Sequence, residues 1–180
     1  MRFPIRKQYD AMDCGPTCLQ MIAEYYGQYY SLQTLREKSY LTRNGSSLKG
    51  ISSAAKSIGF KTESVWMNWE QLIQNTHLPC IIHWDNNHFI VVYSIKRENK
   101  ILVADPAFGK LTYNKDDFLK HWITDKKNNV GIVFQLKPTS KFYENKPDTR
   151  KDFPFKRLFK YLKPHKKYLC FLMTALTIGC

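Results

Sequence analysis

The chain has 180 residues, which is enough for one well-formed core with a short appendage and excludes two full domains. Its formal net charge is +13, but residues 1–135 carry 17 Lys or Arg against 12 Asp or Glu, whereas residues 136–180 carry 11 against 3. The excess positive charge therefore belongs to a C-terminal segment that ends in an apolar run. That arrangement is typical of a segment beside a membrane, and it does not indicate a nucleic-acid-binding face.

Cysteine usage indicates the redox setting. The five cysteines stand at positions 14, 18, 80, 170 and 180, an odd number with uneven spacings. The opening residues, MRFPIRKQYD, contain no apolar core of a secretory signal. We therefore expect no disulfide framework and a reducing, cytosolic environment.

The first 60 residues predict three helices. The first follows Cys14 and ends at Gly27, and the next two begin after the capping residues Ser31 and Ser47. TRNGSS predicts the turn before the third helix, and Gly59 ends that helix. These elements predict a helical subdomain.

β-Rich runs dominate the following residues up to position 136. FKTESVWM predicts a strand, PCIIHW, HFIVVYSI and KILVADP predict three more, and FGKLTY and VGIVFQL predict the last two. Asn68 and Asn114 are expected to cap short helices between them. Helices first and strands afterwards predict an α+β domain over residues 1–136, with an N-terminal helical subdomain packed on an antiparallel β-sheet.

The C-terminal segment changes in composition. Residues 137–152 are polar and interrupted by prolines, so they are expected to form a linker. Residues 153–180 begin with FPFKRLFKYLK, a basic amphipathic stretch, and close with 13 apolar residues, YLCFLMTALTIGC. A membrane-spanning helix needs about 20 residues. We expect a truncated first transmembrane helix here; the alternative is a C-terminal core helix.

The stretch QYDAMDCGPTCLQMI places Cys14 at the start of the first predicted helix. Pro16 is suited to a first helical turn, where its missing N–H is not needed. The helix dipole and unpaired N–H groups at this position favour a thiolate. A small buried cysteine that only fills space is the alternative for Cys14 by itself.

A cysteine nucleophile needs a base, and the base needs a group to orient it. Among the five histidines, His88 is favoured because it opens a strand directly after the DNN turn. Asp105 ends the next strand of the predicted hairpin, so antiparallel pairing returns it to the side of His88. Asp85 is the competing acid, in a turn where solvation is expected.

Two further assignments stay open on spacing alone. Gln8, six residues before Cys14, is either a donor to an oxyanion formed at the cysteine or a solvent-facing loop residue. The pairs Cys14–Cys18 and His83–His88 fall within zinc-ligand spacing, but 64 residues separate Cys18 from His83, much farther than in small zinc modules. A buried, inert Cys18 is the simpler interpretation, so no metal is expected.

With Gln8, the DCG around Cys14, the LQMI that follows, the HFIVV from His88 and the ADP ending at Asp105 and Pro106, the chain resembles the bacteriocin-processing cysteine peptidases. These are the papain-like domains at the N-terminus of peptidase-containing ABC transporters. The resemblance covers residues 1 to about 136. It implies Cys14 as nucleophile, His88 as base and then acid, Asp105 as the group orienting His88, and Gln8 as an oxyanion donor.

The resemblance also implies a substrate and partners. The family cuts a leader peptide after a Gly-Gly pair on the cytosolic side, and leaders bind as amphipathic helices in an apolar groove. The tyrosines at positions 25, 26, 29 and 30 are candidates for that groove, with ordinary packing as the alternative. A membrane location with the peptidase facing the cytoplasm, transporter membrane domains and a homodimer also follow from the resemblance.

One departure limits the function of these residues. No GxxxxGK[ST] motif is present, so ATP binding is expected only in a nucleotide-binding domain outside this sequence, and no cofactor is expected in this chain. The alternative function is a non-catalytic peptidase-like domain that binds and recruits an export substrate. Relatives of that kind lack part of the catalytic set, whereas Gln8, Cys14, His88 and Asp105 are all present here.

Overall fold

The computed structural model describes residues 3–39, 47–97 and 99–149. The chain divides into two units, Met1–Asp148 and Thr149–Cys180. The first unit contains every element described below. The predicted turn over 42–47, apart from Ser47, and the predicted amphipathic and transmembrane stretch over 153–180 lie outside the described residues. Within the described ranges, no helix is both long and apolar enough to cross a bilayer.

The N-terminal helices begin and end where the sequence predicts. Ser31 and Ser47 accept the backbone N–H of the third residue of their helices, which satisfies one of the unpaired donors at each N-terminus. Gly27 and Gly59 follow the helix ends with φ of 90° and 99°, a conformation that suits glycine. The elements are the 3-10 helix η1 (Ala11–Asp13) and the helices α1 (Cys14–Tyr25), α2 (Leu32–Lys38) and α3 (Leu48–Ser57).

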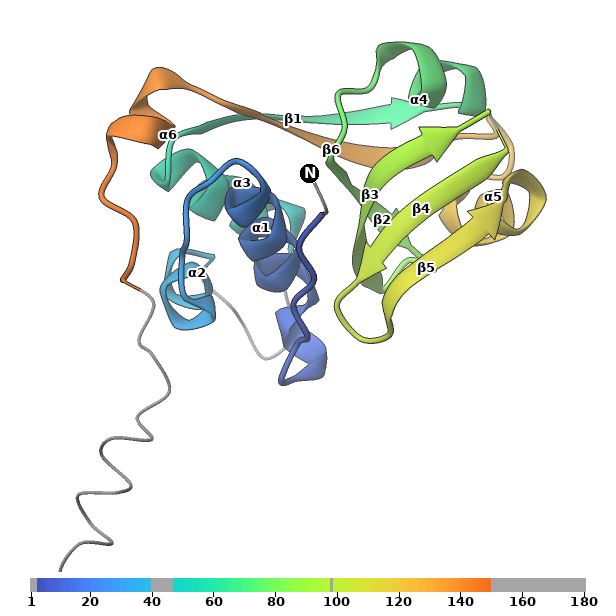
Figure 1. Cartoon of the computed structure of the whole chain (residues 1–180). Coiled ribbons are helices and arrows are strands. Elements are labelled where there is room, and N and C mark those ends of the chain that lie inside the picture. Colours follow the sequence, from blue (N-terminus) through green and yellow to red (C-terminus); the bar gives the residue numbers. More distant parts are fainter. Residues whose placement is uncertain (1–2, 40–46, 98, 150–180) are drawn as a thin grey trace, which may run out of the picture. The chain divides into compact units, whose positions relative to one another are not determined.

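The strands form one six-stranded antiparallel sheet in the order β1-β6-β2-β3-β4-β5 (Figure 1). Asn68 and Asn114 cap the two short helices between the strands, as predicted. The predicted α+β class with an antiparallel sheet is therefore confirmed. The strands are β1 (Phe60–Met67), β2 (Cys80–Trp84), β3 (His88–Lys96), β4 (Lys100–Asp105), β5 (Gly109–Asn114) and β6 (Gly131–Pro138), and the helices are α4 (Trp69–Asn75) and α5 (Lys115–Trp122).

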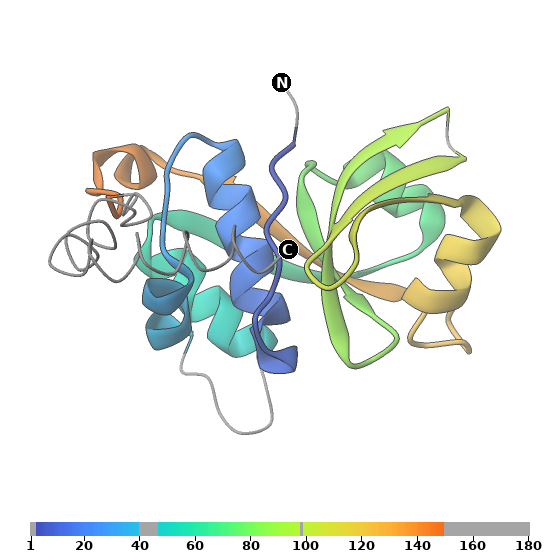
Figure 2. The ribbon, with the colours of Figure 1, turned by 60° about the horizontal axis from the view of Figure 1, so that its bottom comes forward.

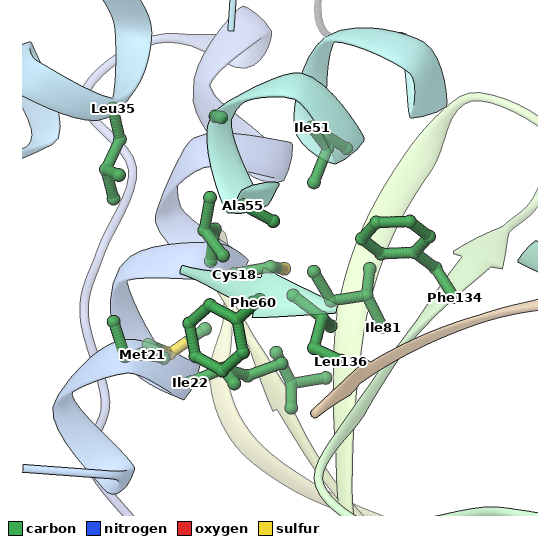
Figure 3. Packing of buried hydrophobic residues seen from close by; sticks show 14 of the residues in the cluster. Cys18, Met21, Ile22, Leu35, Ile51, Ala55, Phe60, Ile81, Phe134 and Leu136 are labelled. Carbon is green, nitrogen blue, oxygen red and sulfur yellow. The ribbon is translucent and has the colours of Figure 1, made fainter. Parts of the chain in front are cut away.

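Apolar cores cover both faces of the central strands, which explains why the runs in β2 and β3 are apolar without alternation. One core joins the sheet to α1 and α3, and the other joins it to α4 and α5 (Figures 1 and 2). In β3, Phe89 and Val91 belong to the first core while Ile90 and Val92 belong to the second. Figure 3 shows the first core, where Cys18 and Ile22 of α1 pack near Ile81, Phe134 and Leu136 of the sheet.

The segment predicted as a linker from residue 137 differs from that expectation. Strand β6 continues to Pro138, and helix α6 (Ser140–Glu144) follows it. Phe142 is fully buried, with its ring centroid 4.4 Å from that of Phe60. Asp148 accepts hydrogen bonds from the Ser31 N–H at 2.8 Å and the Thr34 hydroxyl at 2.6 Å. The domain therefore extends to about Asp148, because the buried ring of Phe142 and the carboxylate of Asp148 hold this polar segment against the rest of the domain.

Candidate active site

Cys14 is the first residue of α1, and its side chain is buried, with 4% of the residue exposed. Gly15 and Pro16 complete the first turn, where a proline satisfies its fixed φ and loses no helical hydrogen bond. Helix α1 packs against β3, the strand that His88 opens. The thiol thus lies at the positive end of a helix that faces the sheet.

His88 and Asp105 meet as the predicted hairpin requires. Strand β3 pairs antiparallel with β4, with Val91 opposite Ala104, so the end of β4 lies beside the start of β3. His88 Nε2 and Asp105 Oδ1 are 3.0 Å apart. Both side chains are largely covered, with 18% of His88 and 4% of Asp105 exposed. The sequence prediction that antiparallel pairing brings them together is confirmed by this distance.

Backbone groups hold the Asp105 carboxylate in place. The N–H groups of Ala107 and Phe108 donate to Asp105 Oδ1 at 2.7 and 3.3 Å. Burial by itself raises the pKa of Asp105, but the hydrogen bond with His88 and these N–H groups outweigh burial and lower it below 3.8. The carboxylate is therefore ionised near neutral pH and fixes the orientation of the imidazole.

The same interactions keep His88 charged. Burial lowers the pKa of His88, but the hydrogen bond to Asp105, a second side-chain hydrogen bond to Cys14 and the charges of both groups raise it from 6.5 to about 9. Because Nε2 is bonded to Asp105, the other ring nitrogen, Nδ1, is the one left for Cys14. An imidazolium beside a cysteine favours the thiolate form. The geometry places a charged imidazole beside the Cys14 thiol.

Gln8 joins the N-terminal segment to the loop that follows Asp105. Its backbone N–H donates to the Pro106 carbonyl at 3.0 Å. Its Oε1 is buried, and no described residue hydrogen-bonds to that atom. The structure thus places the backbone of Gln8 beside Pro106, the residue after Asp105. The amide oxygen of Gln8 is buried and does not face solvent.

The competing candidates have other partners. Asp85 lies 2.8 Å from Nδ1 of His121, at the surface, and not against His88. The Cys18 thiol is fully buried and donates to the Phe89 carbonyl at 3.2 Å, and burial raises its pKa well above 9.0. His83 packs against the Phe89 ring, with centroids 5.1 Å apart. Among the residues that the structure describes, no three His, Cys, Asp or Glu side chains gather as metal ligands.

One ion pair next to the nucleophile was missed by the sequence analysis. Asp13, directly before Cys14, accepts hydrogen bonds from Nε of Arg36 at 2.6 Å and from Nη2 of the same guanidinium. Only 2% of the Asp13 side chain is exposed. Nothing in the sequence links residues 23 positions apart on separate elements, and Asp13 was noted only as part of the DCG motif.

A helix-borne thiol, an imidazole at the head of a strand and a carboxylate that orients it define a cysteine hydrolase of the papain-like class. The sequence profile of the Peptidase C39 family matches residues 2–128. The chain therefore belongs to the Peptidase C39 family and is a cysteine peptidase domain, as the predicted resemblance implies.

Curated relatives agree with this membership. The chain is 32% identical over 141 residues to the probable microcin-H47 secretion/processing ATP-binding protein MchF of Escherichia coli, covering 78% of the chain and 19% of the relative. It is 31% identical to the colicin V secretion/processing ATP-binding protein CvaB of the same species, covering 83% of the chain and 20% of the relative. The chain thus spans about a fifth of the length of these relatives.

Solved structures share the fold. The double glycine motif protease from an AMS/PCAT transporter, determined in complex with the leader peptide, superposes with a TM-score of 0.70 at 29% identity, covering 77% of this chain and 93% of that one. The peptidase domain of Streptococcus ComA gives a TM-score of 0.68 at 29% identity, covering 77% of this chain and all of that one.

Proposed function

We propose that the chain cleaves the leader of bacteriocin-like peptides after a Gly-Gly pair, in a process coupled to ABC-type export. The observation that carries the proposal is the Cys14–His88–Asp105 arrangement, which has the order of groups and the charged imidazole that thiol proteolysis uses. The similarity to a double glycine motif protease supports the choice of substrate.

The reaction follows from the roles of three side chains. The Cys14 thiolate attacks the carbonyl carbon of the second glycine, and the electron pair of the C=O bond moves to oxygen. The C–N bond then breaks as His88 gives its Nδ1 proton to the leaving amine, which releases the mature peptide and leaves a thioester. Water, deprotonated by His88, hydrolyses the thioester, so the leader leaves as a carboxylic acid and the thiolate is restored.

Gln8 is proposed to donate its side-chain N–H to the oxyanion, together with the backbone N–H at Cys14. Its placement beside Pro106, and an amide oxygen that is buried, support an amide turned with its nitrogen toward the reacting carbonyl. Preorganised donors of this kind are typically worth about 10²–10³ in rate.

The glycine requirement fits the burial of the site. Cys14 and Asp105 are 4% and 3% exposed, so little of either group is open to an approaching peptide. Glycines approach such a covered sulfur with the least hindrance, whereas a Cβ on either glycine would add bulk directly before the scissile bond. A leader that binds as a helix on the apolar surface would place its Gly-Gly pair there.

Membrane attachment, orientation and partners are also proposals. We place the peptidase on the cytoplasmic side of a cell membrane, next to transporter domains that resemble those of the relatives' full-length proteins, with a homodimer as the assembly. The basic residues over 136–180 support this orientation. ATP is proposed to act in transport through a separate nucleotide-binding domain, and peptide hydrolysis is proposed to use only groups of this chain and water.

The test uses the full 180-residue chain and a synthetic peptide with a Gly-Gly leader junction under reducing conditions. We expect cleavage after the second glycine by mass spectrometry, its complete loss in Cys14→Ala, and its retention in Cys80→Ala. Cys80 is a matched control because it is another fully buried thiol, in the core on the other face of the sheet. If the wild type and Cys14→Ala bind the peptide alike and neither cuts it, the domain is a recruitment module and the proposal fails.

A further inference from the structure

The carboxylate of Asp13 is diverted away from the helix that it precedes. Asp13 is the N-cap residue of α1, a position where an aspartate usually accepts a hydrogen bond from its own helix. Within the described residues, the Asp13 side chain makes no such capping bond. It accepts instead from the Arg36 guanidinium of α2 and from the Asp10 N–H at 3.0 Å.

The contact with the Asp10 N–H is part of the capping box of η1, and the first turn of α1 receives no side-chain acceptor from Asp13. Its third residue is Pro16, which has no N–H, so a capping carboxylate would have to turn to the N–H groups of Cys14 or Gly15. Those groups lie at the nucleophile, where an oxyanion forms when a peptide is attacked. A carboxylate there would place a negative charge where a second one must develop.

Arg36 keeps the Asp13 carboxylate away from these N–H groups and offsets its negative charge. The guanidinium contacts both carboxylate oxygens, and this bidentate pairing fixes the orientation of the Asp13 side chain. Asp13 is 2% exposed, so an unpaired charge there would be poorly screened by water. The hydrogen bond to Asp13 raises the pKa of Arg36, so the guanidinium stays charged.

We infer that Asp13 and Arg36 are positioning residues for the peptidase reaction. Their pairing holds the residue before Cys14 against α2, neutralises its charge beside the thiolate, and leaves the N-terminal N–H groups of α1 available to the substrate oxyanion. This inference rests on the proposed function, since the oxyanion belongs to peptide cleavage. Its effect on the thiolate does not depend on any peptide.

The experiment compares Arg36→Met with the double variant Asp13→Asn/Arg36→Met in the full chain. Arg36→Met leaves an uncompensated carboxylate beside Cys14, so we expect kcat on a Gly-Gly peptide to fall by about tenfold or more with KM little changed. Alkylation of Cys14 by iodoacetamide near neutral pH, followed by mass mapping of its peptide, is expected to slow in parallel. The double variant contains no carboxylate at this position and is expected to recover most of both rates.

A matched control lies at the other end of the same helix. Arg6 binds Glu24 of α1 in the same bidentate geometry, at 2.8 and 2.7 Å. The exposed fraction of the Arg6 side chain is 39%, similar to the 37% of Arg36. Arg6→Met is expected to lower the melting temperature as much as Arg36→Met without changing kcat or the alkylation rate. Equal kinetic losses in both variants would show a merely structural role and overturn the inference.

Two further outcomes separate this inference from the proposed function. Arg36→Lys serves as a second variant should Arg36→Met not fold, because it keeps the positive charge. Its alkylation rate is expected to stay near that of the wild type. A slower alkylation of Cys14 in Arg36→Lys overturns the inference. If the wild type cuts no Gly-Gly peptide while alkylation still slows in Arg36→Met and recovers in the double variant, the proposed function fails and the positioning role stands. A double variant that is folded but as slow as Arg36→Met refutes the role.

Discussion

Replacing Asp105 with asparagine is expected to move the basic limb of the cleavage pH profile to lower pH. Asparagine is nearly isosteric and keeps an oxygen for the Ala107 N–H, so the change removes mainly the charge that faces His88. His88 has a pKa of about 9, against 6.5 without its surroundings, and this difference corresponds to about 3 kcal/mol in favour of the charged ring. Asp105 is the largest of the groups that raise this pKa, and burial opposes it.

The expected effect follows from the populations of the charged ring. With a pKa near 9 the imidazolium is about 90% populated at about pH 8, and with a pKa near 7 it is about 10% populated. We therefore expect kcat/KM at about pH 8 to fall roughly tenfold from ionisation alone, and the basic limb to move down by more than about one pH unit. Loss of the interaction that orients the His88 ring lowers kcat/KM further at every pH.

The assay is hydrolysis of a Gly-Gly peptide by the full chain between about pH 6 and pH 10. Asp116→Asn, which removes an exposed carboxylate from α5, is the control and is expected to leave both limbs in place. A basic limb that stays where it is in Asp105→Asn would refute the argument that this carboxylate keeps His88 charged.

The same interaction predicts a pH-dependent stability. Because the folded pKa of His88 lies above its unfolded value, its stabilisation is complete below about pH 6.5 and is lost as the pH rises through about 9. The destabilisation caused by Asp105→Asn is therefore expected to shrink between these limits, measured by urea unfolding at several pH values. Two changes in the C-terminal part of the domain give further predictions. Phe142→Ala is expected to lower the free energy of unfolding by about 3–5 kcal/mol, because it empties a fully buried site beside Phe60, and chemical denaturation measures this. Asp148→Ala is expected to cost about 1 kcal/mol by removing the acceptor at the start of α2, whereas Asp125→Ala in an exposed turn serves as its comparison; no loss in Asp148→Ala would contradict the assigned contacts.

Local rules predicted the secondary structure well because the starts of α2, α3, α4 and α5 are determined by neighbouring residues. The capping side chains of Ser31, Ser47, Asn68 and Asn114 all accept the expected N–H groups. The hairpin placed His88 and Asp105 together because antiparallel register follows from two strands and a short turn. These contacts depend on short separations along the chain.

Long-range packing was not predictable in the same way. Phe142 and Tyr143 stand in an otherwise polar, proline-containing stretch, and the folded positions of Tyr26 and Phe60 give Phe142 its buried site. The Arg36 guanidinium reaches Asp13 because α2 packs beside α1, and neither helix contains a pattern that specifies this pairing. Composition therefore predicted a linker at residues 137–152, whereas tertiary contacts form the end of β6, helix α6 and a segment held by Asp148 in its first part.

Cys18 shows how a residue without chemistry contributes to the site. It lies one helical turn after Cys14, and its thiol donates to the carbonyl of Phe89, the residue after His88. A small side chain with a buried donor lets α1 approach β3 closely at this point. The helix that holds the nucleophile and the strand that holds the base are therefore joined directly, within one turn and one residue of the reacting groups. The spacing between thiol and imidazole is thus set by the core, and activity depends on the same contact that stabilises the fold.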